Sequence, residues 1–233
     1  MLFRSNGPEK ENVKIALFAR LDTALPVESI IASSSSGLLI SRIQSGCVHP
    51  ERCVIGHPFN PPHLMPLVEV VGGEATSPGT IARTMAFYRE IGKHPIHIRA
   101  EVTGHVANRL QAALWREAIH LVDTGVASVA DVDAAVSYGP GLRWALMGPS
   151  LTFHLGGGEG GMAHFMAHLG GPMQTWFDAL GSPELTPERQ QKIIDGVAEA
   201  TAGRSVADLA GERDARLVEL LKLKVLPADE PSA

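Results

Sequence analysis

Cys53-Val54-Ile55-Gly56-His57-Pro58 and, shortly after it, Leu67-Val68-Glu69-Val70-Val71 are two apolar stretches that each carry one ionisable side chain. Short apolar runs rich in β-branched residues predict buried strands, here close enough in sequence to be neighbours in one sheet. Glu is depleted in strands and is almost never fully buried without a partner. We therefore expect Glu69 to bind His57 at the end of the adjoining strand. The alternative is a solvated edge strand from which Glu69 points outward.

A buried pair of this kind has a defined chemistry. A carboxylate that accepts a hydrogen bond from one imidazole nitrogen fixes the tautomer of the ring and raises the basicity of the other nitrogen. A general base that works near neutral pH needs this arrangement. The sequence therefore predicts proton abstraction by His57, assisted by Glu69.

The first 98 residues alternate between helical and strand patterns. Helices are expected over residues 8–24 and 78–91 and from Leu38, and strands over residues 30–33, 53–56, 67–71 and 95–98. Strands that alternate with helices indicate an α/β layer built around a largely parallel sheet. The opening residues Met1 to Ser5 carry no capping pattern, and we expect that an upstream part of the natural protein is missing. The alternative is a short natural tail.

Strand signals nearly stop after Arg99. Helices are expected over residues 106–122, behind the cap Ser128, and over residues 161–169, 187–200 and 205–222. The predicted fold class is thus α/β followed by all-α. The predicted domains are residues 1–98, a helical domain over residues 99–226, and a tail over residues 227–233.

Composition narrows the class of protein. The 233 residues are 45% hydrophobic and 19% charged, which suits a globular protein of one large or two smaller domains. A net charge of -5 gives no basic footprint for nucleic acid or an anionic membrane. No apolar run approaches the roughly 20 residues of a membrane helix, and no signal peptide opens the chain. Two cysteines are too few for a disulfide framework, which favours the cytoplasm.

The run Gly156 to Gly161 matches the dinucleotide pattern G-x-G-x-x-G. That motif also needs a second strand ending in an acidic residue about 20 positions later, and no such strand pattern follows. A connection between helices is the preferred interpretation, and a cofactor loop is the alternative.

Two groups of potential metal ligands lack the spacing of known sites. The first group lacks the spacing of a zinc site, and it consists of Cys47, His49, Cys53 and His57. The second group is His164 with His168, and it lacks the Glu of H-E-x-x-H. We therefore expect no metal.

Two polar features complete the candidate site. The run Ser33-Ser34-Ser35-Ser36-Gly37 follows a strand, where hydroxyls and amides can meet a ligand at the carboxyl end of a sheet. Asn108 opens the long helix after residue 106. The alternatives are a plain turn for the serine run and a solvated face for Asn108.

Five runs together resemble the 3-hydroxyacyl-CoA dehydrogenase family, which includes L-carnitine dehydrogenases and the lambda-crystallin-like L-gulonate dehydrogenases. The matching runs are Ala32–Ser36, Gly56–Pro61, Leu67–Val70, Gly92–Pro95 and Gly104–Arg109. The resemblance extends over residues 6–223, and the order of the motifs makes it specific. It implies a Rossmann-type nicotinamide domain, followed by a helical domain like the C-terminal domain of 6-phosphogluconate dehydrogenase. It also implies a homodimer formed through that helical domain.

The resemblance implies a role for each matching residue. His57 would be the catalytic base, and Glu69 would orient it. Ser36 would bind the substrate oxygen and lie against the nicotinamide ribose, and Asn108 would complete the contacts to the developing carbonyl. Lys14 matches the family lysine that contacts the NAD cofactor.

The run Gly141-Leu142-Arg143-Trp144 looks most like the L-carnitine dehydrogenase branch. An aromatic face attracts a trimethylammonium group, and Arg clamps a carboxylate, so Arg143 and Trp144 are the candidate substrate-binding residues. The alternative places Trp144 in the core and Arg143 in a surface ion pair. The expected reaction is oxidation of L-carnitine to 3-dehydrocarnitine. Oxidation of 3-hydroxybutyryl-CoA or L-gulonate, and a non-catalytic crystallin-like role, are the alternatives.

The 233 residues differ from the family pattern in two respects. They lack the Gly-rich strand–turn–helix and the acidic residue that hold the adenosine half of NAD, and Ser5 stands where related chains usually carry Glu. We therefore expect this chain alone to be inactive and poorly soluble.

Overall fold

The computed structural model describes residues 1–223. Residues 224–226 of the predicted helical domain, and the predicted tail, lie outside this range. The chain divides into two compact units, the first formed by Met1–Gln111 and the second beginning at Ala112. The predicted domain boundary after residue 98 remains a prediction.

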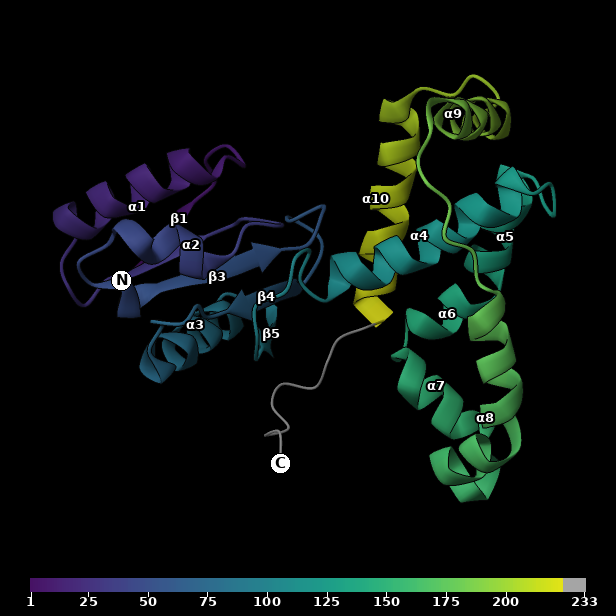
Figure 1. Ribbon diagram of the computed structural model, residues 1–233, viewed down its shortest axis with the longest axis horizontal. Helices are drawn as coiled ribbons and strands as arrows, with labels where there is room; N and C mark the ends of the chain where they lie inside the picture. The colour runs from purple at the N-terminus through teal and green to yellow at the C-terminus, as the bar shows by residue number, and fades with distance from the viewer. Residues whose placement is uncertain (224–233) are drawn as a thin grey trace. The chain divides into compact units, whose positions relative to one another are not determined.

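A five-stranded sheet with helices around it forms the first unit (Figure 1). The strands lie in the order β1 (Leu2–Ser5), β2 (Ile30–Ser33), β3 (Cys53–Pro58), β4 (Leu67–Val71) and β5 (His94–Ile98). All neighbouring pairs are parallel except β3 and β4, which are antiparallel. A parallel return needs a crossover of about a dozen residues or more, and the short connection over residues 59–66 does not allow one. The predicted α/β layer with a largely parallel sheet is confirmed.

Three helices cover the two faces of this sheet (Figure 1). Helices α1 (Glu11–Ala24) and α2 (Ile40–Ile43) contribute Phe18, Ile40 and Ile43 to one buried cluster, together with Ile31 and Ile55 from the strands. Helix α3 (Pro78–Glu90) contributes Tyr88 to a second cluster. The strand residues of the second cluster alternate with those of the first, so both faces of the sheet are buried.

Strand β1 was not predicted. Its four residues show no alternation of buried and exposed positions, and only Ser5 is buried. The strand exists because it pairs with β2, in a register that sets Ser5 beside Ser33. The Ser34 N–H extends this ladder by donating to the Ser5 carbonyl at 3.0 Å. The ladder therefore aligns the segments that follow Ser5 and Ser33 at one end of the sheet.

The buried side of α1 is partly polar. Its buried residues are Lys14, Phe18 and Asp22, whereas Val13, an expected apolar position, is 40% exposed. The helix begins at Glu11, after the expected start at Pro8. The buried charges on this helix each have partners, as buried charges require.

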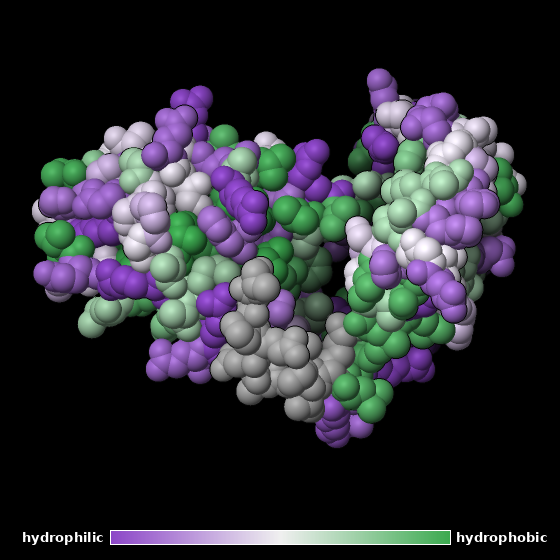
Figure 2. All heavy atoms as spheres, turned by 90° about the horizontal axis from the view of Figure 1, so that it is seen from below, coloured by the Kyte–Doolittle hydropathy of each residue, from purple (hydrophilic) through white to green (hydrophobic). Residues whose placement is uncertain are grey.

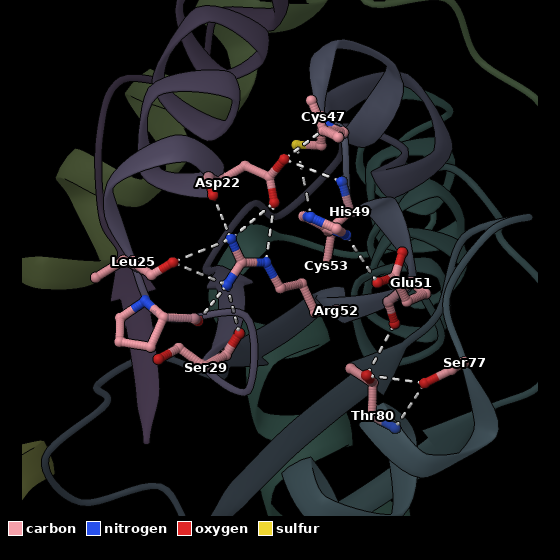
Figure 3. Close-up of polar contacts among 12 residues, drawn as sticks. Asp22, Leu25, Ser29, Cys47, His49, Glu51, Arg52, Cys53, Ser77 and Thr80 are labelled. Carbon is pink, nitrogen blue, oxygen red and sulfur yellow. Dashed lines mark hydrogen bonds and ion pairs between the residues drawn. The ribbon is translucent and has the colours of Figure 1, made fainter.

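Asp22 and Arg52 form a buried ion pair (Figure 3). Arg52 Nε lies 2.9 Å from Asp22 Oδ1, and the guanidinium also donates to the carbonyls of Leu25 and Ser29. The other Asp22 oxygen accepts from the N–H groups of Val48 and His49 at 2.6 and 3.0 Å. The pair thus ties α1 to the turn that precedes β3.

The second unit is helical, as predicted. Its helices are α4 (Ala107–Asp123, which begins in the first unit), α5 (Val129–Tyr138), α6 (Pro140–Trp144), α7 (Pro149–Gly156), α8 (Gly161–Ala179), α9 (Pro187–Thr201) and α10 (Val206–Leu223). The predicted Ser128 cap forms a capping box with Asp131. No helix within residues 1–223 is long and apolar enough to cross a membrane.

Two helices of this unit, α6 and α7, were not predicted, and α8 continues ten residues past the predicted end at Leu169 (169 to 179). Pro172 lies inside α8, and because proline usually kinks or ends a helix, the predicted helix was too short. The residues directly before the Gly-rich run, Leu151–Leu155, lie in α7. The cofactor-loop alternative for Gly156–Gly161 is therefore wrong, since that loop must follow a strand.

Candidate active site

His57 and Glu69 face each other across β3 and β4. They are directly paired in the antiparallel register, so both side chains lie on the same face of the sheet. His57 Nδ1 lies 2.9 Å from Glu69 Oε2. Glu69 is fully buried, and β4 lies between β3 and β5. The predicted contact is present, and the edge-strand alternative for Glu69 is wrong.

The other carboxylate oxygen of Glu69 binds the start of α4. Its Oε1 accepts from the N–H groups of Val106 and Ala107, each at 2.9 Å. A helix N-terminus favours a negative charge. Burial raises the pKa of Glu69, but the hydrogen bonds from His57, Ala107 and Val106 outweigh it and hold this pKa below its usual value. Glu69 is therefore ionised at neutral pH and accepts the Nδ1 proton of His57.

The free nitrogen of His57 faces the serine run. With Nδ1 protonated, Nε2 carries the lone pair of the neutral ring, and Ser36 Oγ lies 3.1 Å from it. Ser36, which follows β2, His57 on β3 and Glu69 on β4 thus form one hydrogen-bonded chain. The plain-turn alternative for the serine run gives no account of this contact.

Lys14 lies inside the same unit and is 1% exposed. Its Nζ donates to the Gly7 carbonyl at 3.2 Å and to Ser33 Oγ at 3.3 Å. Glu9 Oε2 lies 3.7 Å away and supplies the opposite charge. The ammonium group therefore lies beside the residue that ends β2, three positions before Ser36.

Two residues near the site were not predicted, Glu9 and His105. Glu9 Oε1 accepts from the N–H groups of Ser36 and Gly37, each at 3.1 Å. His105 Nε2 donates to the Ser35 carbonyl at 3.0 Å, and the His105 ring lies 5.1 Å from that of His57. His105 lies within the matched run Gly104–Arg109 and Glu9 lies outside the matched runs, and no pattern in the sequence assigns either residue a contact.

Asn108 lies in the first turn of α4, two positions after Val106. It is half-buried, and its side chain makes no hydrogen bond to any residue within 1–223. Its place beside the backbone that binds Glu69 suits the predicted role, which remains a prediction.

Arg143 and Trp144 lie in the second unit, on α6. Trp144 is 37% exposed, so the core alternative is wrong. Arg143 has no ion pair to the part of the chain that the structure describes, so the ion-pair alternative also fails. The predicted roles of these two residues in binding substrate remain predictions.

The potential metal ligands do not assemble. Within residues 1–223, no group of three or more His, Cys, Asp or Glu side chains is placed to hold a metal ion. Cys47 and Cys53 lie side by side instead, with their sulfur atoms 3.7 Å apart (Figure 3).

Comparison with known proteins decides the family. The NAD binding domain of 3-hydroxyacyl-CoA dehydrogenase matches residues 5–102, and the C-terminal domain of the same family matches residues 104–199. The L-carnitine dehydrogenase of Streptomyces coelicolor is 50% identical over 94% of this chain and 69% of its own length. The chain belongs to the 3-hydroxyacyl-CoA dehydrogenase family.

Further similarities agree with this family. The L-carnitine dehydrogenase of Bacillus cereus is 48% identical over 95% of this chain and 68% of its own length. Among solved structures, the NAD+-dependent 5-formyl-3-hydroxy-2-methylpyridine 4-carboxylic acid 5-dehydrogenase matches with a TM-score of 0.77. It is 28% identical, and the match covers 96% of this chain and 72% of that one. The 3-hydroxyacyl-CoA dehydrogenase family comprises NAD-dependent oxidoreductases that act on CH–OH groups, and NAD is its cofactor.

The described residues include groups that suit the nicotinamide end of NAD but none that form the usual loop for its adenosine half. Lys14 Nζ on α1 and the Ser36 hydroxyl both lie at the carboxyl end of β2, where the predicted contacts to the nicotinamide end of NAD require a cation and a hydroxyl. Within residues 1–223, the run that matches G-x-G-x-x-G extends from the end of α7 to the first residue of α8 and follows no strand. The adenosine half therefore has no recognisable binding loop in the described part of this chain.

Proposed function

We propose that this protein oxidises the 3-hydroxyl carbon of L-carnitine, or of a similar 3-hydroxy acid, with NAD as acceptor. The observation that carries the proposal is the chain of contacts Ser36–His57–Glu69. It leaves a basic nitrogen of His57 facing a hydroxyl donor, with an ionised carboxylate behind it.

Ser36, His57 and Glu69, together with Asn108, each have a role in this reaction. When bound, NAD would supply the hydride acceptor for this oxidation. His57 Nε2 removes the hydroxyl proton, and Glu69 stabilises the imidazolium that forms. Ser36 then donates a hydrogen bond to the substrate oxygen, and Asn108 completes the polar contacts to the developing carbonyl.

The chemistry of L-carnitine suits the residues on α6. The substrate carries a trimethylammonium group and a carboxylate. The exposed ring of Trp144 attracts the cation, and the fork of Arg143 binds the carboxylate in a bidentate manner. Similarity to L-carnitine dehydrogenases at 50% and 48% identity supports this substrate.

The test uses an extended enzyme, defined as residues 1–233 joined behind the amino-terminal segment of the S. coelicolor enzyme that precedes the aligned region. We expect it to oxidise L-carnitine with a kcat/KM at least about a hundredfold above that for 3-hydroxybutyryl-CoA, because a buried or stacked cation contact is worth roughly 2 kcal/mol and the carboxylate clamp adds to it. The measurement is the rate of NADH formation, followed by its absorbance, with each substrate.

The 233-residue chain serves as the comparison for the same assay. We expect no turnover from it, since its described residues offer no loop for the adenosine half of NAD. Faster oxidation of 3-hydroxybutyryl-CoA or L-gulonate by the extended enzyme would replace the proposed substrate. Failure to oxidise any of the three would favour the non-catalytic, crystallin-like role.

We also propose a homodimer formed through the helical unit. Figure 2 shows hydrophobic residues gathered on helices of this unit, and contiguous exposed apolar surface marks an interaction site. On α7 and α8, Leu151, Leu155, Trp176 and Phe177 are each at least 50% exposed. We expect the extended enzyme to sediment as a dimer, and a monomer at micromolar concentration would contradict this proposal.

A further inference from the structure

The peptide bond between Ser35 and Ser36 is held from both sides. Its carbonyl oxygen accepts from His105 Nε2 at 3.0 Å, and its N–H donates to Glu9 Oε1 at 3.1 Å. We propose that Glu9 and His105 are positioning residues, which clamp this peptide and thereby aim the Ser36 hydroxyl at His57. The inference rests on the proposed function, because it assigns the clamp to the residue that binds the substrate oxygen.

Glu9 holds the serine run by more than one contact. Its Oε1 also accepts from the Ser35 hydroxyl and from the Gly37 N–H, so three donors converge on one oxygen. Burial raises the pKa of Glu9, but the hydrogen bonds from Ser35 and Gly37 and the charge of Lys14 lower it below its usual value. Glu9 therefore binds the run as a carboxylate.

The ladder between β1 and β2 brings Glu9 to this place. Ser5 and Ser33 are paired in parallel register, so the residues after each of them leave the same edge of the sheet side by side. The carboxylate of Glu9 comes four residues after Ser5. The three donors come two to four residues after Ser33. The contact thus joins two segments that are about 27 positions apart.

His105 and the two residues after it contact each part of the Ser36–His57–Glu69 chain. Its ring lies against His57, its Nε2 holds the peptide of Ser36, and the next two backbone N–H groups bind Glu69. Its φ of 52° is rare for a residue with a side chain, and such strain concentrates at functional sites. Its ring is buried, and Nδ1 has no hydrogen-bond partner among residues 1–223. The positive φ and the unpartnered Nδ1 both cost free energy, so we infer that the His105 side chain does more than pack.

The variants Glu9→Ala and His105→Phe remove the two contacts separately. His105→Phe keeps a ring beside His57 and loses only the donor. In the extended enzyme we expect each variant to lower kcat about tenfold to a hundredfold with little change in KM, because misplacing a reacting group by an ångström costs on that order. Glu9→Gln retains an acceptor oxygen and should recover part of the loss. Glu11→Ala, an exposed carboxylate two positions away, is the matched control.

The decisive comparison is made in a Ser36→Ala background. Residues that act through Ser36 lose their effect once its hydroxyl is gone, so Glu9→Ala and His105→Phe should change kcat little there. A loss of the same size in both backgrounds would overturn the clamp, because it would indicate general damage. A kcat for Glu9→Ala equal to that of Glu11→Ala would also overturn it.

A second measurement separates this inference from the proposed function. The ring ¹⁵N signal of His57 Nε2 reports its hydrogen bond to Ser36. Glu9→Ala should shift this signal as Ser36→Ala does, whereas Glu11→Ala should not. If the extended enzyme oxidises no 3-hydroxy acid, the proposed function fails and this signal alone decides the clamp. If it oxidises one and neither kcat nor the signal responds to Glu9→Ala, the clamp alone fails.

Discussion

Replacement of His57 by asparagine in the extended enzyme is expected to lower kcat by about 10²–10⁴-fold, the usual contribution of a positioned general base. Asn still reaches toward Glu69 but has no nitrogen that takes up a proton. The measurement is the pre-steady-state rate of NADH formation, which separates hydride transfer from product release.

The control for this variant is His97→Asn. His97 lies on β5 and is exposed, so its replacement tests the general effect of losing an imidazole from the sheet. Glu69→Gln should give an intermediate loss, because the amide retains the shape of the carboxylate but not the charge that stabilises the imidazolium. A kcat for His57→Asn within about tenfold of the unmodified enzyme would contradict the role of His57.

The Arg52→Met substitution is expected to reduce the free energy of unfolding by about 3–5 kcal/mol, the usual cost of removing one partner of a buried ion pair. Asp22 then remains buried with only the Val48 and His49 N–H groups, and the carbonyls of Leu25 and Ser29 lose a donor. The measurement is urea unfolding followed by circular dichroism. Arg20→Met, an exposed arginine on α1, is the matched control and should have little effect.

The pH dependence of the same unfolding curves gives an independent check. Burial raises the pKa of Asp22, but hydrogen bonds from His49 and Arg52 lower it below its ordinary value of 3.8. A carboxyl with a lowered pKa in the folded state stabilises the protein above the ordinary value and loses this contribution as the pH falls through the folded-state pKa. Arg52→Met should therefore weaken the loss of stability below pH 3.8. An unchanged pH profile would mean that Asp22 gains nothing from Arg52.

The contact between His57 and Glu69 was predictable because strands have a simple geometry. Side chains alternate between faces with a period of two, and a short connection forces neighbouring strands to pair antiparallel. A buried carboxylate in such a strand has few places to find a partner. The helical nature of the second unit followed in the same way from long stretches of helical periodicity.

Glu9 and His105 were not predictable for the opposite reason. The contact of Glu9 depends on the pairing of β1 with β2, and β1 has no periodicity of its own. The contact of His105 depends on its positive φ, a conformation that few residues with a side chain adopt and that no pattern in the sequence marks. Likewise, the buried side of α1 could not be predicted from apolar spacing, because two of its buried residues, Lys14 and Asp22, are charged.

The register between β3 and β4 has a consequence for how this protein tolerates change over evolution. The two residues of the proton-transfer pair are held in place by strand hydrogen bonds on either side of them, while the connection over residues 59–66 contributes no member of the pair. Insertions and deletions in that connection therefore leave the pair intact. A single added residue inside β3 or β4 would turn one partner to the opposite face and abolish it.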